Sequence, residues 1–409
     1  MPWPTGMTSL DPVRNPYAPG AGTPPPELAG RGQILLDART ALRRVQGGRA
    51  ERSVILVGLR GVGKTVLLVK IKEIADDLGF KAAFIEAQEN RSLASLIIPM
   101  LRSILLTVDF SERARDVSKR ALRVLKSFIG SVKISTGDID YGLTINPEVG
   151  VADSGDLQAD LSDLMVAVGE AAKAAEKAIC VLIDELQYVN EVEFSALIMA
   201  IHRVNQLNLP IIVVGAGLPQ ILAHAGSAKS YAERLFRFPQ IGALEPTDAV
   251  AALSNPAVEE GVEYDADALE EILKTTERYP YFIQQWGHDS WNHAKGTTIS
   301  LDDVREATKR ALATLDESFF KVRFDRCTPA ERRYMRALAE LGPGPHRSGD
   351  IAEALGTKST SVAPVRSKLI SKGMIYSPQH GDTAFTVPLF DAYMRRIIPT
   401  FDVISTDGT

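Results

Sequence analysis

The chain has 409 residues, of which 45% are hydrophobic and 7% aromatic, and this composition is sufficient for two or three domains with buried cores. Its 46 Lys and Arg residues against 51 Asp and Glu residues give a net charge of −5, which argues against a protein that coats nucleic acid through bulk charge. The two cysteines, Cys180 and Cys327, lie outside any Cys-x-x-Cys or Cys/His cluster, so neither a disulfide framework nor a zinc site is predicted.

Residues 1–27 form the first predicted segment, a proline-rich extended arm. Eight of the 23 prolines fall within its first 26 residues, and no basic start followed by an apolar run is present, so a signal peptide is not expected. No apolar run in the chain approaches the roughly 18 residues that a membrane span requires. These features predict a cytoplasmic protein without a membrane partner.

Residues 28–245 are predicted to fold as an α/β domain around a five-stranded parallel sheet. Continuous apolar runs typical of buried parallel strands occur at 53–57, 82–85, 179–183 and 211–214. Helical periodicity follows each run, as crossover helices require, and a fifth strand is expected over 236–241. Between the second and third strands, period-two alternation predicts an inserted hairpin at about 131–147.

Two smaller blocks complete the chain. Residues 246–317 show only helical patterns, over 248–253, 266–276, 282–294 and 301–315, and are predicted to form a helical lid whose last helix opens with a capping box at Ser300 and Asp303. Residues 328–400 contain ten Lys and Arg against six Asp and Glu, with three helical segments followed by a hairpin. That order predicts a winged helix-turn-helix, followed by a short tail at 401–409.

A complete P-loop pattern, Gly-x-x-x-x-Gly-Lys-Thr, occupies residues 58–65 directly after the first predicted strand. Successive backbone N–H groups of such a loop curl around a phosphate at the positive end of the following helix. Lys64 would reach the β- and γ-phosphates, and Thr65 would ligate Mg²⁺. A glycine-rich turn without a ligand is the alternative, disfavoured by the strand, the lysine and the threonine together. The predicted nucleotide-binding residues here are Gly58, Gly61, Val62, Gly63, Lys64, Thr65 and Val66.

The third predicted strand ends in two adjacent carboxylates, Asp184 and Glu185. Beside a P-loop, such a strand end delivers Asp184 to the Mg²⁺ shell and places Glu185 where it can deprotonate the attacking water. Without a P-loop, an apolar run that ends in Asp-Glu would more often mark a helix N-terminus.

With these motifs, the chain resembles the AAA+ ATPases, in particular the origin-recognition-like and archaeal-ATPase-like branch, which shades into the STAND signalling ATPases. The resemblance covers nearly the whole chain after the arm and implies ATP or ADP with Mg²⁺ as cofactors. The segment that ends at Arg31 is similar to the family's entry segment, which packs against adenine, and Pro280 stands in a motif similar to that of its lid.

Arg234 and Arg237 stand where many relatives present an arginine finger to a neighbouring subunit. The resemblance therefore implies a homo-oligomer that forms on ATP binding. The alternative is that both side chains face solvent or pair with Glu233. In Gly215-Ala-Gly217 the chain lacks the Asn or Thr that most AAA+ members place there, and no second sensor arginine is evident, which implies slow hydrolysis.

The predicted function is that of an ATP-binding AAA+ ATPase that acts as a nucleotide-dependent conformational switch and associates with duplex DNA through its winged helix. Two alternatives stand beside it. One is a STAND-like signalling ATPase whose winged helix contacts proteins only, and the other is a nucleotide-locked scaffold with little turnover. The candidate DNA contacts are Ser359, Ser361, Arg366 and Lys368.

Overall fold

The computed structural model describes residues 10–20, 22–107, 112–132, 145–228 and 232–401. These residues fall into two compact units. The sheet unit comprises residues 33–57 and 64–240, and the helical unit comprises the described parts of 1–32, 58–63 and 241–409. Within the described residues, no helix is long and apolar enough to cross a membrane.

A parallel sheet in the order β2-β3-β4-β1-β5 is the centre of the sheet unit, which confirms the predicted five-stranded parallel sheet. Its strands are β1 (Ser53–Gly58), β2 (Lys81–Glu86), β3 (Ile179–Asp184), β4 (Ile211–Gly217) and β5 (Phe236–Arg237). Every residue of β1, β3 and β4 is buried, as expected for central parallel strands with covered faces. The strand predicted over 236–241 is interrupted at Pro239, whose carbonyl accepts from the Val57 N–H, and a separate β6 (Gln240–Ile241) also pairs with β1.

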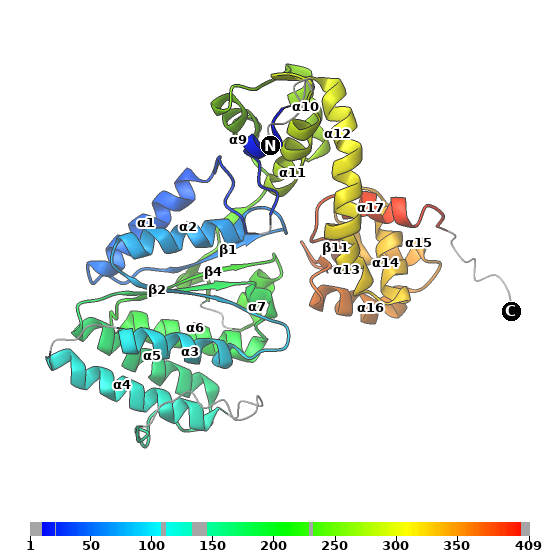
Figure 1. Ribbon diagram of the computed structural model, residues 1–409. Helices are drawn as coiled ribbons and strands as arrows, with labels where there is room; N and C mark the ends of the chain where they lie inside the picture. The colour runs from blue at the N-terminus through cyan, green and yellow to red at the C-terminus, as the bar shows by residue number, and fades with distance from the viewer. Residues whose placement is uncertain (1–9, 21, 108–111, 133–144, 229–231, 402–409) are drawn as a thin grey trace. The chain divides into compact units, whose positions relative to one another are not determined.

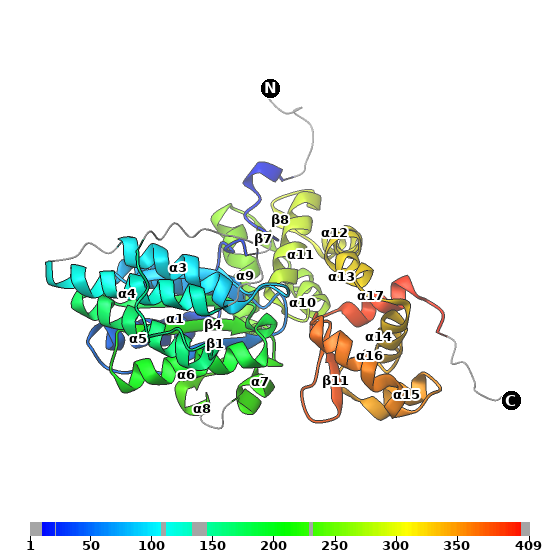
Figure 2. The ribbon, with the colours of Figure 1, turned by 90° about the horizontal axis from the view of Figure 1, so that it is seen from below.

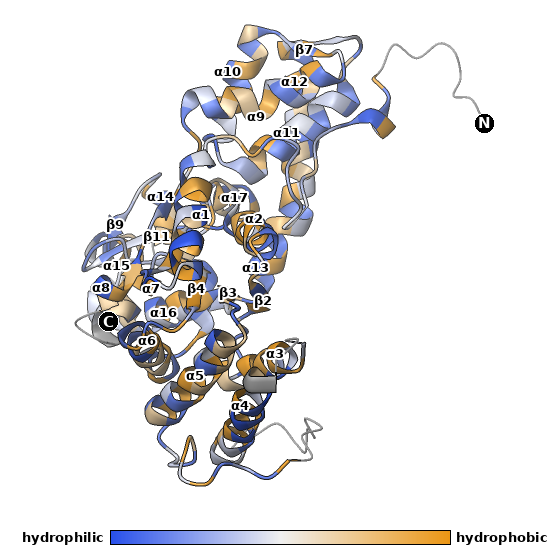
Figure 3. Ribbon diagram, turned by 90° about the vertical axis from the view of Figure 1, so that its left-hand side faces the viewer, coloured by the Kyte–Doolittle hydropathy of each residue, from blue (hydrophilic) through white to orange (hydrophobic). Residues whose placement is uncertain are grey.

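Helices cover both faces of this sheet (Figure 1). One face carries α1 (Gly32–Gln46) and α2 (Lys64–Asp77). The other carries α3 (Leu93–Thr107), α5 (Leu157–Ala174) and α6 (Glu191–Gln206), shown from outside in Figure 2. Outside them, α4 (Glu112–Ser131) packs on α5 through a buried apolar stripe, and Figure 3 shows hydrophobic and hydrophilic residues alternating along α4.

The hairpin predicted at about 131–147 falls mainly on residues 133–144, outside the described residues. Beside that segment, the buried Asp160 carboxylate accepts hydrogen bonds from the Ser131 hydroxyl and from the backbone N–H groups of Ser154 and Gly155. Asp160 therefore links Ser131, where the predicted hairpin begins, to the turn at Ser154 and Gly155.

The helical unit contains α9 (Pro246–Glu259), α10 (Ala266–Thr275), α11 (Pro280–His293) and α12 (Leu301–Thr314), which a π-helical stretch at Leu315–Phe320 joins to α13 (Lys321–Asp325). The capping box that opens α12 at Ser300 and Asp303 is confirmed. The prediction that only helices occur here was wrong. Two short strands, β7 (Glu263–Tyr264) and β8 (Thr298–Ile299), form a parallel pair too short to produce detectable periodicity.

The N-terminal segment packs on these helices through Tyr17, which is buried. The Tyr17 hydroxyl donates to the Leu253 carbonyl and accepts from the Tyr264 hydroxyl at 3.0 Å. The indole Nε1 of Trp291 donates to the Asp11 carbonyl at 2.9 Å. This part of the predicted arm is therefore built into the helical core.

The C-terminal part of the helical unit consists of four helices and a small antiparallel sheet. The helices are α14 (Pro329–Glu340), α15 (Ser348–Ala354), α16 (Ser359–Ser371) and α17 (Phe390–Ile397). The sheet has the order β10-β11-β9, formed by Ile375–Tyr376, Asp382–Phe385 and His346–Arg347. The strand β11 begins at Asp382, which pairs with Arg347.

Gly287 on α11 provides a test of the Tyr17 packing, because a Cβ there would lie 2.7 Å from a ring carbon of Tyr17. Gly287→Ala should lower the free energy of unfolding by about 1–3 kcal/mol, measured by urea denaturation. In Gly130→Ala on α4 the added Cβ meets nothing within 4 Å, so this control should gain up to about 1 kcal/mol from helix propensity. Equal unfolding midpoints for the two variants would contradict a stabilising role for this contact.

Candidate functional site

The P-loop joins the end of β1 to the start of α2 at Lys64, and the boundary between the two compact units runs through it. Gly61 and Gly63 have φ angles of +79° and +90°, in the left-handed region that favours glycine. A Cβ at Gly58 would lie 2.1 Å from the Ile241 carbonyl oxygen, so this position also requires glycine. The side chains of the predicted nucleotide-binding residues Val62 and Val66 are buried, which leaves only their backbones for a ligand.

Thr65 and Asp184 meet although 119 positions separate them in the sequence. The Thr65 hydroxyl donates to Asp184 Oδ2 at 2.6 Å, and the Glu185 N–H donates to Asp184 Oδ1 at 2.8 Å. Burial raises the pKa of the Asp184 carboxyl, and the hydrogen bond from Thr65 opposes that rise. A buried carboxylate beside a hydroxyl oxygen is a set of hard oxygen donors that fits Mg²⁺.

Two further carboxylates stand at the same edge of the sheet. Glu185 follows β3 with a left-handed backbone, φ 54°, and its carboxylate accepts from the Gln187 side-chain amide. Glu86 ends β2 in register with Asp184. Burial raises the pKa of Glu86, and repulsion from Asp184 and Glu185 raises it further. Glu86 was not predicted as a site residue, although its place directly after a predicted strand was a usable signal.

Arg31 is buried in the helical unit, with 8% of its surface exposed. One guanidinium nitrogen, Nη2, donates to the Gly242 carbonyl at 2.6 Å and to the Val62 carbonyl of the P-loop at 3.3 Å. Burial lowers the pKa of Arg31. The entry segment predicted to pack against adenine thus ends in a side chain that binds the P-loop backbone.

Within the helical unit, two other backbone contacts reach the first half of the P-loop. Pro280 begins α11, and the N–H of the next residue, Tyr281, donates to the Gly61 carbonyl at 3.1 Å. The Arg60 N–H donates to the Thr386 carbonyl, directly after β11, at 3.0 Å. Segments far apart in the sequence therefore converge on residues 58–63.

The two candidate arginine fingers differ in exposure. Arg234 is exposed on α8 (Ala232–Leu235), whereas Arg237 is half-buried on β5. The Nε atom of Arg237 is buried and has no hydrogen-bond partner among the described residues. Both lie at the β5 edge of the sheet, away from β3.

The candidate DNA residues on α16 also differ from one another. Ser359, Ser361 and Lys368 are exposed. Arg366 instead holds the small sheet: its Nε donates to the Thr383 hydroxyl at 2.9 Å, and its Nη2 donates to the Asp382 carbonyl at 2.8 Å.

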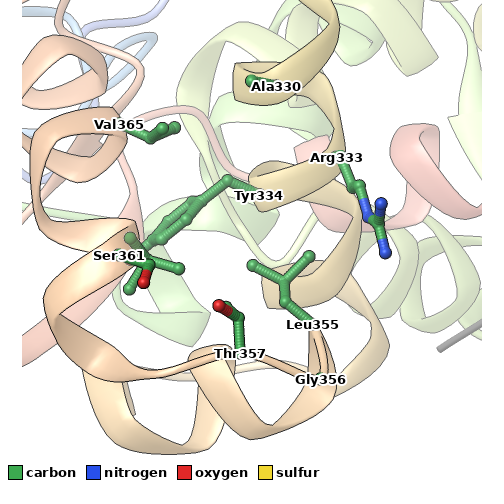
Figure 4. Close-up of a pocket in the computed structure, with 9 residues that line it drawn as sticks. Ala330, Arg333, Tyr334, Leu355, Gly356, Thr357, Ser361 and Val365 are labelled. Carbon is green, nitrogen blue, oxygen red and sulfur yellow. The ribbon is translucent and has the colours of Figure 1, made fainter. Parts of the chain in front are cut away.

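Ser361 lines a pocket of about 340 Å³ between α14, the turn before α16 and α16 itself (Figure 4). Arg333 and Thr357 are among the other residues that line this pocket. Arg333 was not predicted as a site residue, because only the folded chain brings this cation on α14 to the same pocket as α16.

Comparisons with known proteins find a family match over most of the sheet unit. Residues 27–214 match the model of an AAA ATPase domain, which confirms the predicted resemblance to AAA+ ATPases. Residues 317–394 match a model described only as a domain of unknown function, DUF8462. No curated protein sequence matches the chain.

Among solved structures, the likeness in fold rests on an ATPase of Pyrococcus abyssi. The Walker-type ATPase PABY2304 of Pyrococcus abyssi is similar with a TM-score of 0.53 and 16% identity, over 91% of this chain and 97% of that one. The Aeropyrum pernix Orc1 protein in complex with DNA gives a TM-score of 0.47 and 14% identity, over 91% and 94% of the two chains. Cdc6p from Pyrobaculum aerophilum gives 0.47 and 15%, over 95% and 98%.

Arg31→Ala tests the contact between the entry segment and the P-loop. Removing the guanidinium leaves the Val62 and Gly242 carbonyls without this donor, which should lower the free energy of unfolding by about 1–3 kcal/mol. Amide hydrogen exchange in residues 58–63 should accelerate. Arg39→Ala, an exposed position on α1, is the control and should change stability by less than about 0.5 kcal/mol. Unchanged exchange in Arg31→Ala would show that Arg31 does not order the loop.

Proposed function

We propose that the protein binds and slowly hydrolyses ATP and uses the bound nucleotide as a conformational switch. The observation that carries this proposal is the contact between Thr65 and Asp184. The P-loop hydroxyl of Thr65 and the carboxylate at the end of β3 meet at 2.6 Å. The P-loop itself has the left-handed glycine conformations that let backbone N–H groups turn toward a phosphate.

Each residue has a role in this proposal. Lys64 and the backbone N–H groups of residues 58–65 bind the phosphates, and Thr65 and Asp184 hold Mg²⁺. Bound Mg²⁺ would neutralise charge on the phosphate oxygens. Glu185 accepts the proton of the attacking water, and Arg31 and Tyr281 keep the P-loop backbone in place.

The same proposal includes a route from nucleotide to the C-terminal helices. The Arg60 N–H belongs to the P-loop and donates to the Thr386 carbonyl. A phosphate that draws P-loop N–H groups toward itself would compete for this donor and loosen the contact at Thr386. We also propose a homo-oligomer on ATP binding, in which the exposed Arg234 supplies a cation to a neighbouring subunit.

Glu185→Gln separates binding from chemistry. The amide keeps the size of the side chain but cannot accept the proton, so ATP affinity should stay within about threefold while hydrolysis falls about 100-fold or more. Isothermal titration with ATP·Mg²⁺ and steady-state phosphate release measure the two effects. Lys64→Ala is the matched control, and its main effect should be a loss of affinity for ATP. Full turnover in Glu185→Gln, or undiminished affinity in Lys64→Ala, would refute the assignment.

We propose further that the C-terminal helices and small sheet form a winged helix that binds duplex DNA. Lys368, Ser359 and Ser361 are exposed on α16, and the exposed Arg333 on α14 lines the same pocket as Ser361. These side chains would contact phosphates, whereas Arg366 would act by holding the wing.

Salt dependence distinguishes these two roles. Log affinity for a duplex should fall linearly with log salt, and Lys368→Ala should make the slope shallower by about one unit. Arg366→Ala should weaken binding with less change of slope, because its effect passes through the wing. Lys309→Ala on α12 is the control and should leave binding unchanged. No duplex binding at about 50 mM salt with either ATP or ADP would favour the signalling alternative, in which these helices contact only proteins.

A further inference from the structure

We propose that Gln187 is the positioning residue of the hydrolytic site, which holds the Glu185 carboxylate and ties it to the carboxyl end of β4. This inference rests on the proposed ATPase function and adds to it a residue that no sequence motif marks. Four features of the sheet unit carry it: the backbone of Glu185, the two hydrogen bonds of the Gln187 amide, its burial, and the glycines of β4.

The backbone after β3 brings residues 185 and 187 together. Glu185 has φ 54° and ψ 38°, and the short helix Leu186–Tyr188 follows. A non-glycine residue rarely adopts this left-handed conformation, and such outliers persist where the surroundings require them. Here the turn folds the Gln187 side chain back onto its neighbour, so that Nε2 donates to Glu185 Oε2.

The other end of the same amide reaches β4. Gln187 Oε1 accepts from the N–H of Leu218, the residue directly after β4, at 3.0 Å. Because one partner is a carboxylate and the other an N–H, only one orientation of the amide satisfies both. Gln187 is 7% exposed, so water competes little for either bond. The amide is therefore a fixed bridge between Glu185 and the end of β4.

The glycines at the end of β4 leave room for this bridge. A Cβ at Gly215 would lie 2.2 Å from a methyl carbon of Leu186, and a Cβ at Gly217 would lie 3.3 Å from Gln187 Oε1. A larger residue at either position would displace Leu186 or Gln187. The glycines of β4 thus leave space for the Gln187 side chain, which comes from the segment after β3.

Fixing one oxygen of a general base limits the directions in which the carboxylate can accept a proton. Gln187 should therefore act on the rate of hydrolysis and not on nucleotide affinity. It donates to Glu185, whereas the phosphate and Mg²⁺ ligands that we propose are other residues.

The test uses the full-length protein, with kcat and KM from steady-state ATPase assays and ATP·Mg²⁺ affinity from calorimetry. Gln187→Met keeps length and volume but removes both hydrogen bonds, and Gln187→Glu keeps an oxygen for the Leu218 N–H but loses the donor to Glu185. Each should lower kcat about tenfold or more and change affinity by less than about threefold. Gln206→Met, at an exposed position on α6, is the control and should keep wild-type kcat.

A double mutant shows whether Gln187 acts through Glu185. In the Glu185→Gln background, measured by single-turnover hydrolysis, Gln187→Met should cause little further loss, because the group that it positions is gone. The proposal is overturned if Gln187→Met lowers the rate by the same factor in both backgrounds, or if both Gln187 variants keep wild-type kcat. Failure of the proposed function appears separately, as full hydrolysis in Glu185→Gln alone or as no hydrolysis in the wild type.

Discussion

Asp184 is a carboxylate that the fold buries at the end of a central strand, and Thr65, Glu86 and Glu185 gather around it. Its exposed surface is 4%, and burial raises its pKa. Thr65 and the Glu185 N–H each donate to one of its oxygens, which offsets part of that cost. Glu86 and Glu185 add negative charge nearby. Such a cluster opposes folding by its own repulsion, and a cation bound there would stabilise it, so the proposed metal binding would be coupled to stability.

The sequence predicts the parts of this site that follow from short-range patterns of residues. Continuous apolar runs mark strands buried on both faces, and parallel topology then brings their carboxyl ends to one edge. The P-loop and the Asp184–Glu185 pair therefore fall at the same edge without any knowledge of contacts. Boundaries are less accurate, because a single residue such as Pro239 splits the fifth strand without altering its apolar character.

Contacts between distant segments could not be predicted in this way. Arg31 binds two carbonyls, of Val62 and Gly242, that no spacing rule connects to it. Gln187 follows Glu185 by two residues, but its importance depends on a left-handed backbone and on the glycines of the neighbouring strand. Sequence alone shows that β4 lacks a polar side chain at its end. Only the folded chain shows that an amide from another segment fills the space.

Which cations of residues 328–400 are available to a ligand also depends on the folded structure. Six of its ten cations are engaged with carbonyls, hydroxyls or carboxylates of the chain itself: Arg332, Arg336, Arg366, Lys372, Arg395 and Arg396. The exposed remainder is Arg333, Arg347, Lys358 and Lys368. Each phosphate contact contributes about −0.9 to the salt slope, so a monomer that uses all four would give a slope no steeper than about −4. Tight binding to duplex DNA would then require base contacts or several subunits on one duplex. In the second case, the proposed DNA association would depend on the proposed oligomer.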